Sequence, residues 1–345
     1  MTTQLDCSIG MKKETVYGTG VTPDQFLEFL SESFDRDAKF EQGKGLRPGY
    51  RVARGGRRVL VREGAKGSLT VEAPTKGLGA LLEAALGTVT NTAVPAAAGV
   101  FQQVHSPAIT DPLASYTIQK GIPPLGGGPT HALTFPGMMC ASLEINAKES
   151  AIVEVTTDWT GREVLTATGY APPAYPTPLD LFTFVHGAVY VGGSVTAPTA
   201  TALALGGTSV ANITELSVKW DNGLDAGGYT LGGAGKRVRK AVAGLASLGG
   251  KLGAEYDSVV LRDAFLAQTG LSLLLTFTHS SLIGTGTPVP PVLQLWVPQI
   301  KLDGELPKAN GGDVITQSID FTGLDPQVAS QAPFYVVYRS TDAAP

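Results

Sequence analysis

The chain has 345 residues, a formal net charge of −4 at pH 7 and only 16% charged residues. The acidic balance argues against a dedicated nucleic-acid binder. Cys7 and Cys140 are far apart in sequence, so they suggest free thiols rather than a disulfide framework or a zinc motif. The length allows two domains of ordinary size. With 43 glycines, the composition predicts a turn-rich, mainly β protein that buries surface against copies of itself.

Residues 1–25 show no hydrophobic periodicity and are predicted to form an extended N-terminal arm. This arm lacks the apolar stretch of a signal peptide, and the chain has no run of 18 apolar residues, so no membrane span is expected. Short strands are predicted over 25–33 and 37–41, where apolar and polar residues alternate.

A glycine-rich hairpin or loop over 43–67 concentrates arginine, at Arg47, Arg51, Arg54, Arg57, Arg58 and Arg62. One interpretation is a patch that contacts phosphates. The other is a solvated or subunit-interface loop whose arginines pair with carboxylates of a neighbour. The second is favoured because only Tyr50 interleaves the arginines, and because a matching segment at 236–240, with Lys236 and Arg237, is shorter and less basic.

An amphipathic helix is predicted over about 74–87. Its apolar stripe has helical spacing, and the chain offers Thr75 as an N-cap and Gly87 as the C′ residue. A second helix is predicted over about 257–270, where Ser258 and Gly270 occupy the corresponding positions.

These two helices belong to a longer internal similarity. Residues 68–87 align without a gap on 251–270, and residues 131–163 align without a gap on 293–325. Upstream, Arg57-Arg58-Val59 corresponds more loosely to Lys236-Arg237-Val238. Three matched segments in the same order indicate a duplication, although strands of similar composition always align a little. The sequence therefore predicts two tandem domains, each a β-sandwich or partial barrel with one flanking α-helix.

The predicted domain boundaries follow from this alignment. The first domain spans 26–170 and carries an insertion at 88–112 that the second lacks, which suggests a surface segment. A proline-rich linker at 171–178 leads into the second domain, 179–340. Residues 341–345 are expected to be a loose tail.

The last matched strand of each domain has a polar face. Glu154 and Asp158 alternate with apolar residues in the first copy, and Asp320 does so in the second. Both strands are therefore predicted to be half-buried with a polar outer face.

No catalytic, cofactor or metal site is predicted. The four histidines lack partners at metal-ligand spacing, and no nucleophile elbow occurs. The glycine loop before Lys236 resembles a P-loop only faintly, because Arg237 follows where Ser or Thr is required. Glu72 and Glu255 are one position in two copies, so they do not form a designed catalytic pair. An enzyme is therefore the least expected class.

The sequence resembles the major tail tube proteins of bacteriophages with long, non-contractile tails. The resemblance runs over most of the chain and is carried by residues 12–34, 45–59, 67–87, 182–193, 221–238 and 313–342. The insertion at 88–112 departs from the pattern. The resemblance implies a structural virion protein without cofactors, assembled in the host cytoplasm, whose protomers close into rings that stack into a tube and conduct double-stranded DNA. A tape-measure protein and a tail terminator are implied as partners.

Within this family, rings are commonly built from six tube domains. A chain with two domains is therefore expected to form a trimeric ring with pseudo-sixfold symmetry, with a hexameric ring as the second choice. A lumen that must not hold DNA should be neutral or acidic, which makes Glu154, Asp158 and Asp320 candidates for it. The arm and the arginine loop are expected to contact other subunits between rings. The candidate contact residues are Arg47, Arg51, Arg54, Arg57, Arg58, Lys236 and Arg237.

Two alternatives stay open. One is another ring protein of the tail, such as a terminator or baseplate hub, which would form single rings. The other is a β-sandwich module that binds glycans without polymerising. Glycan sites usually present exposed aromatic residues, whereas Trp159, Trp220 and Trp296 lie in strand patterns that suggest core positions.

Overall fold

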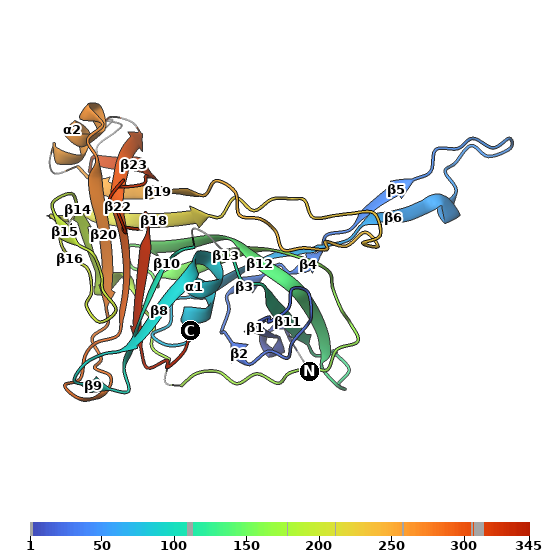
Figure 1. Ribbon diagram of the computed structural model, residues 1–345, viewed down its shortest axis with the longest axis horizontal. Helices are drawn as coiled ribbons and strands as arrows, with labels where there is room; N and C mark the ends of the chain where they lie inside the picture. Colours follow the sequence, from blue (N-terminus) through green and yellow to red (C-terminus); the bar gives the residue numbers. More distant parts are fainter. Residues whose placement is uncertain are drawn as a thin grey trace.

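The computed structural model describes residues 3–108, 113–177, 179–210, 212–256, 259–304, 306 and 314–345. Over these residues the chain is mainly β, as the sequence predicts, with two short α-helices, α1 (Gly79–Leu86) and α2 (Val260–Ala267). Figure 1 shows an elongated body from which one long hairpin extends.

A continuous antiparallel sheet, called the central sheet below, joins the two halves of the chain (Figure 1). It has eight positions, the first of which is shared by two short strands. In spatial order its members are β3 (Ser31–Glu32) with β4 (Asp35–Arg36), β7 (Ala65–Glu72), β13 (Glu154–Gly161), β12 (His131–Lys148), β18 (Ile213–Asp221), β19 (Ser247–Glu255), β23 (Thr316–Gly323) and β22 (Val292–Gly304).

Further strands extend the two long members, β12 and β22, into outer layers. The first layer contains β2 (Gln25–Phe26), β1 (Ser8–Lys13) and β11 (Tyr116–Ile122), which pairs with β12. The second contains β17 (Ser209–Val210), β14 (Gly187–Val191) and β20 (Leu271–Thr278) on one side of β22, and β24 (Tyr335–Ser340), β10 (Phe101–Pro107) and β8 (Gly87–Ala93) on the other. Three small ladders remain: β5 (Lys39–Gln42) with β6 (Arg58–Arg62), β9 (Ala97–Ala98) with β21 (Thr285–Gly286), and β15 (Val195–Thr196) with β16 (Leu205–Gly206).

The two halves use the same pairing order. In the first half β2, β1, β11, β12, β13, β7 and β3/β4 follow one another, and in the second half β17, β14, β20, β22, β23, β19 and β18 do so. The register also agrees. Glu154 lies opposite Glu72, and Thr316 lies opposite Glu255. These are the positions that the two ungapped sequence alignments match.

The largest hydrophobic core of the described residues lies beneath the central sheet and runs through both halves. Successive side chains of a strand point to opposite faces of the sheet, so every second residue of each strand enters this core. All three tryptophans are buried, and Trp159 and Trp220 belong to this core. They therefore offer no exposed aromatic platform of the kind expected in a glycan-binding module.

The helices differ in detail from the prediction. Helix α1 begins at Gly79 rather than near Thr75, because Thr75 N donates a hydrogen bond to Asp180 O (2.8 Å) and does not serve as a cap. Gly87 ends α1 with a φ of 85°, as predicted for a C′ glycine. Helix α2 ends at Gln268 rather than Gly270, and the expected cap Ser258 lies outside the described residues.

Three segments expected to be peripheral are tied into the fold. The expected arm contains β1, which pairs with β11 and has four buried residues, so this part of the arm belongs to the folded body. The insertion at 88–112 contributes β8 and β10, and β10 pairs with β24 of the second half. The C-terminal residues are held by hydrogen bonds, including Gly77 N to Asp342 (2.6 Å). The proline-rich linker has no helix or strand in its described part, 171–177.

Candidate functional site

The central sheet has one polar face that spans all eight of its positions. Directly paired residues of antiparallel strands point to the same side, so the register defines this face. Its carboxylates are Asp35, Glu72, Glu144, Glu154, Asp158, Glu215, Asp221, Glu255, Asp303 and Asp320. Its cations are Lys66, Lys148, Lys219, Lys251 and Lys301. No arginine of the described chain lies on this face, and carboxylates outnumber lysines.

The three residues singled out from the sequence, Glu154, Asp158 and Asp320, all lie on this polar face, in two strands separated by three others. Asp320 lies opposite Lys251 on one side and Asp303 on the other. Sequence reasoning missed the remaining members because the alternation within one strand does not say which strands are neighbours. The ungapped alignment that matches Glu72 with Glu255 was the signal that could have assigned these two residues to the polar face.

The face is partly neutralised by contacts across strands. Lys219 lies 3.8 Å from Glu144, and Lys148 lies 3.8 Å from Glu215, so both pairs join β12 to β18. Ser142 Oγ donates a hydrogen bond to Asp158 (2.7 Å). Exposed pairs of this kind stabilise a fold only weakly. Their main effect is to leave a mixed surface with a net negative charge.

Within the central sheet the two halves meet at the β12–β18 ladder, called the seam below. Next to it, Asn222 is buried and satisfies three partners. Its Nδ2 donates to Ala85 O (2.8 Å) at the end of α1 and to Cys140 O (3.1 Å), and its Oδ1 accepts from Trp220 Nε1 (2.8 Å). Burial also raises the pKa of the Cys140 thiol, so this cysteine stays protonated and unreactive.

A loop over 222–246, between β18 and β19, lies across the first half of the chain (Figure 1). Lys236 forms an ion pair with Glu163, and Glu63 N donates to Gly235 O (2.8 Å). The ring of Tyr229 lies 5.4 Å from the Arg62 guanidinium and 5.7 Å from that of Arg237. Lys236 and Arg237, expected to contact other subunits, therefore have partners within the chain.

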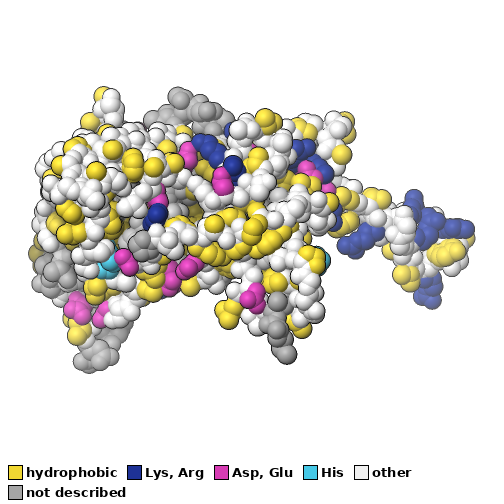
Figure 2. Space-filling view, turned by 90° about the horizontal axis from the view of Figure 1, so that it is seen from below, with side chains coloured by type: hydrophobic (Ala, Val, Ile, Leu, Met, Phe, Trp, Pro, Cys, Tyr) yellow, Lys and Arg dark blue, Asp and Glu magenta, His cyan; other side chains and the backbone are white. Residues whose placement is uncertain are grey.

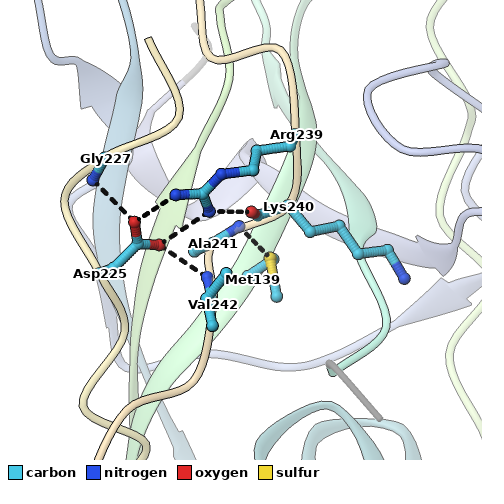
Figure 3. Close-up of polar contacts among 7 residues, drawn as sticks. All are labelled: Met139, Asp225, Gly227, Arg239, Lys240, Ala241 and Val242. Atoms are coloured by element: carbon cyan, nitrogen blue, oxygen red, sulfur yellow. Dashed lines mark hydrogen bonds and ion pairs between the residues drawn. The ribbon is translucent and has the colours of Figure 1, made fainter.

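An internal clasp shapes the same loop (Figure 3). The Asp225 carboxylate accepts hydrogen bonds from Arg239 (2.7 and 3.2 Å) and from Val242 N (2.6 Å). The hydrogen bond from Arg239, followed by that from Val242 N, holds the pKa of Asp225 well below its usual range. Beside the clasp, Ala241 N lies 3.2 Å from Met139 Sδ, which places this side of the loop against β12.

The arginine-rich segment forms the hairpin β5–β6, which projects from the body (Figure 1) and carries a concentration of Lys and Arg side chains (Figure 2). Arg47 stacks on Tyr50 at 5.0 Å, and Arg58 stacks on Phe40 at 5.1 Å. None of five hairpin arginines forms an ion pair with a described residue; these are Arg47, Arg51, Arg54, Arg57 and Arg58. Exposed apolar residues such as Leu46 and Val52 accompany them. This combination is typical of a surface that another protein covers.

The described residues contain no group of three or more His, Cys, Asp or Glu side chains placed to hold a metal ion. None of their helices has the length and apolar character needed to cross a bilayer. The described residues offer a polar sheet face, a projecting basic hairpin and open strand edges.

Comparison with known proteins agrees with this description. No curated protein matches the chain. A family described as phage tail tube protein matches residues 4–323, which is nearly the whole chain. The family is structural rather than enzymatic, and its members are components of the virion tail. On this match, together with the mainly β fold described above, the chain belongs to the phage tail tube protein family.

Proposed function

We propose that three copies of this chain close into a ring, that the rings stack into a tail tube, and that the tube conducts double-stranded DNA. The observation that carries the proposal is the central sheet, in which two halves with the same pairing order and register share one polar face. We take the two halves to be the products of a duplication, so that each supplies one of six tube domains in the ring.

The seam within the chain suggests how neighbouring chains pair. The central sheet ends at β3/β4 on one side and at the end of β22 on the other. In the ring, the end of β22 would pair with β3/β4 of the next copy, as β12 pairs with β18 inside the chain. Such pairing would remove the open edges that otherwise invite aggregation.

The dimensions favour three copies over six. Eight strand positions from each of three chains give a barrel of about 24 strands. At a spacing of about 4.8 Å and a tilt of about 40°, its diameter between backbones is about 50 Å. That leaves room for a double helix about 20 Å wide after side chains line the wall. Six complete chains would give a barrel about 100 Å across, far wider than the duplex.

The polar face would line the channel. Its excess of carboxylates would repel phosphates, so that DNA is not retained. Its cations are lysines, which lack the planar fork with which arginine binds a phosphate bidentately. Glu154, Asp158 and Asp320 would thus be lumen residues. A tape-measure protein and a tail terminator are proposed as partners from the family resemblance, and assembly is proposed to occur in the host cytoplasm.

Electron microscopy of the purified, concentrated protein tests this proposal. Long hollow tubes whose rings have threefold symmetry with a pseudo-sixfold repeat are the expected result. Tubes with six identical chains in each ring would overturn the trimer. Single closed rings would instead favour a terminator or hub protein. A protein that binds glycans and stays monomeric even with a tail-tip complex as nucleus would contradict the tube.

A further inference from the structure

The contact of the loop 222–246 with the first half centres on Glu163. This carboxylate follows the end of β13 and is 9% exposed, because Lys236 from the loop and Arg162 lie against it. The ion pair therefore joins the second half of the chain to the first across the seam.

The matching position in the second half is Asp325. It follows the end of β23 as Glu163 follows the end of β13, and the ungapped alignment of residues 131–163 on 293–325 pairs the two residues. Asp325 is exposed and forms no ion pair with a described residue; its Oδ1 accepts only a hydrogen bond from Gln327 N (2.8 Å). One acidic position is thus covered in the first half and bare in the second.

The matching counterpart of the loop is the arginine hairpin, because the loop joins β18 to β19 and the hairpin joins β4 to β7. The matched triplets Arg57-Arg58-Val59 and Lys236-Arg237-Val238 pair Lys236 with Arg57. Ala65 and Leu248 hold equivalent places in the two ladders. Arg54 precedes Ala65 by as many residues as Arg237 precedes Leu248, so distance along the chain pairs Arg54 with Arg237. On the first correspondence Arg57 takes the place of Lys236, the cation that pairs with Glu163, and on the second Arg54 takes the place of Arg237. Both arginines lie on the projecting hairpin, between β5 and β6.

We infer that Arg54 and Arg57 of one copy bind Asp325 of the neighbouring copy within the same ring. The inference rests on the proposed ring. There the junction between two copies repeats the seam inside one copy, and the hairpin crosses the second half of its neighbour as loop 222–246 crosses the first half. An arginine–carboxylate pair partly buried in this way is short and directional, which would fix the angle between neighbouring copies.

This assignment differs from the contact between rings expected from the sequence for the whole hairpin. Arg54 and Arg57 would act within the ring. Arg47 and Arg51, which lie nearer the end of the hairpin, would remain available to the next ring.

Site-specific crosslinking tests the contact in the full-length chain. Cys7→Ser removes the more accessible native thiol, and Arg57→Cys with Asp325→Cys places one new thiol on each side of the junction. Assembled tubes are treated with a short bis-maleimide and then denatured. A contact within a trimeric ring yields covalent species that stop at three chains. A ladder beyond three chains would show a contact between rings and would overturn the inference, as would tubes that give no crosslink. Asp180→Cys with Arg57→Cys is the off-site control.

Charge reversal gives an independent test. Asp325→Lys, or Arg54→Glu with Arg57→Glu, is expected to raise the protein concentration needed for tubes about tenfold or more. Combining all three changes should restore assembly toward the wild-type concentration. Asp180→Lys is the matched control, and circular dichroism verifies that each variant is folded. If the Asp325→Lys variant forms tubes at the same protein concentration as the wild type, this contact is refuted. If the wild-type protein never forms rings, the proposed function is refuted instead.

Discussion

Helices α1 and α2 hold the same place in the two halves, yet they have different surroundings. Each follows a strand of the central sheet, and each packs on the long strand of its own half, β12 or β22. Seven of the eight residues of α1 are buried, whereas only Leu261 and Ala264 are buried in α2. Leu266 on α2 is 61% exposed.

The difference arises from what the rest of the chain adds to each helix. Helix α1 contacts β8 and β10 from the insertion, Asn222 caps its last turn, and the C-terminal residues lie at its start. Among the described residues, α2 has no equivalent of this cover. Burial of a helix is therefore decided here by distant segments rather than by its own apolar stripe, and substitutions in the unassembled protein can test this difference.

The largest expected effect comes from a matched pair of leucines. Leu82→Ala in α1 should lower the free energy of unfolding by about 3 kcal/mol, because it leaves a cavity in a fully buried site. Leu266→Ala in α2 should change it by less than about 0.5 kcal/mol. Urea unfolding measures both. Equal losses would contradict the difference in cover between the two helices.

Acid should weaken the cover of α1. His105 on β10 is fully buried, and this burial lowers its pKa to about 3. The folded protein thus keeps His105 neutral while the unfolded chain takes up a proton below about pH 6.5, so stability is complete above that pH and is lost as the pH falls. The loss at pH 5 should be about 2 kcal/mol. His105→Gln, which does not titrate, should show a smaller drop between pH 7.5 and pH 5 in urea unfolding.

Asn222→Ala should cost about 1 to 2 kcal/mol. The substitution leaves Trp220 Nε1 and the carbonyls of Ala85 and Cys140 without their partner in a buried site. Thermal unfolding measures the loss, and Asn222→Asp, which keeps the acceptor for Trp220, separates the two sides of the network. An unchanged midpoint in Asn222→Ala would mean that the seam does not support α1.

The smallest expected effect tests the C-terminal residues. Asp342→Ala removes an acceptor for Gly77 N, just before α1, and should cost about 1 kcal/mol. Asp263→Ala, in the first turn of the exposed α2, should change stability by less than about 0.5 kcal/mol. Chemical unfolding measures the two variants side by side. If neither substitution changes stability, the C-terminal residues form a loose tail after all.

The sequence predicted the features that leave a local or repeated pattern. The alternation around Glu154 and Asp158 identified a polar strand face. The two ungapped alignments paired residues that hold equivalent places in the β7–β13 and β19–β23 ladders. The helices were found, but the start of α1 was not, because Thr75 pairs with a distant backbone segment instead of capping the helix. Strand β1 was missed because buried Ser8 and Gly10 interrupt its apolar pattern. The pairing of β10 with β24 joins residues more than 200 positions apart and leaves no local signal.

The covalent continuity of the chain across the seam has a consequence for the free energy of ring closure. Six separate bodies lose five sets of translational and rotational freedom when they join, whereas three two-part chains lose only two. Each set costs at least about 4 kcal/mol at standard concentration. In the proposed ring, half of the junctions would already be made when the chain folds, at an effective concentration that no mixture of single domains reaches. Ring closure would then depend less steeply on the amount of protein in the cell.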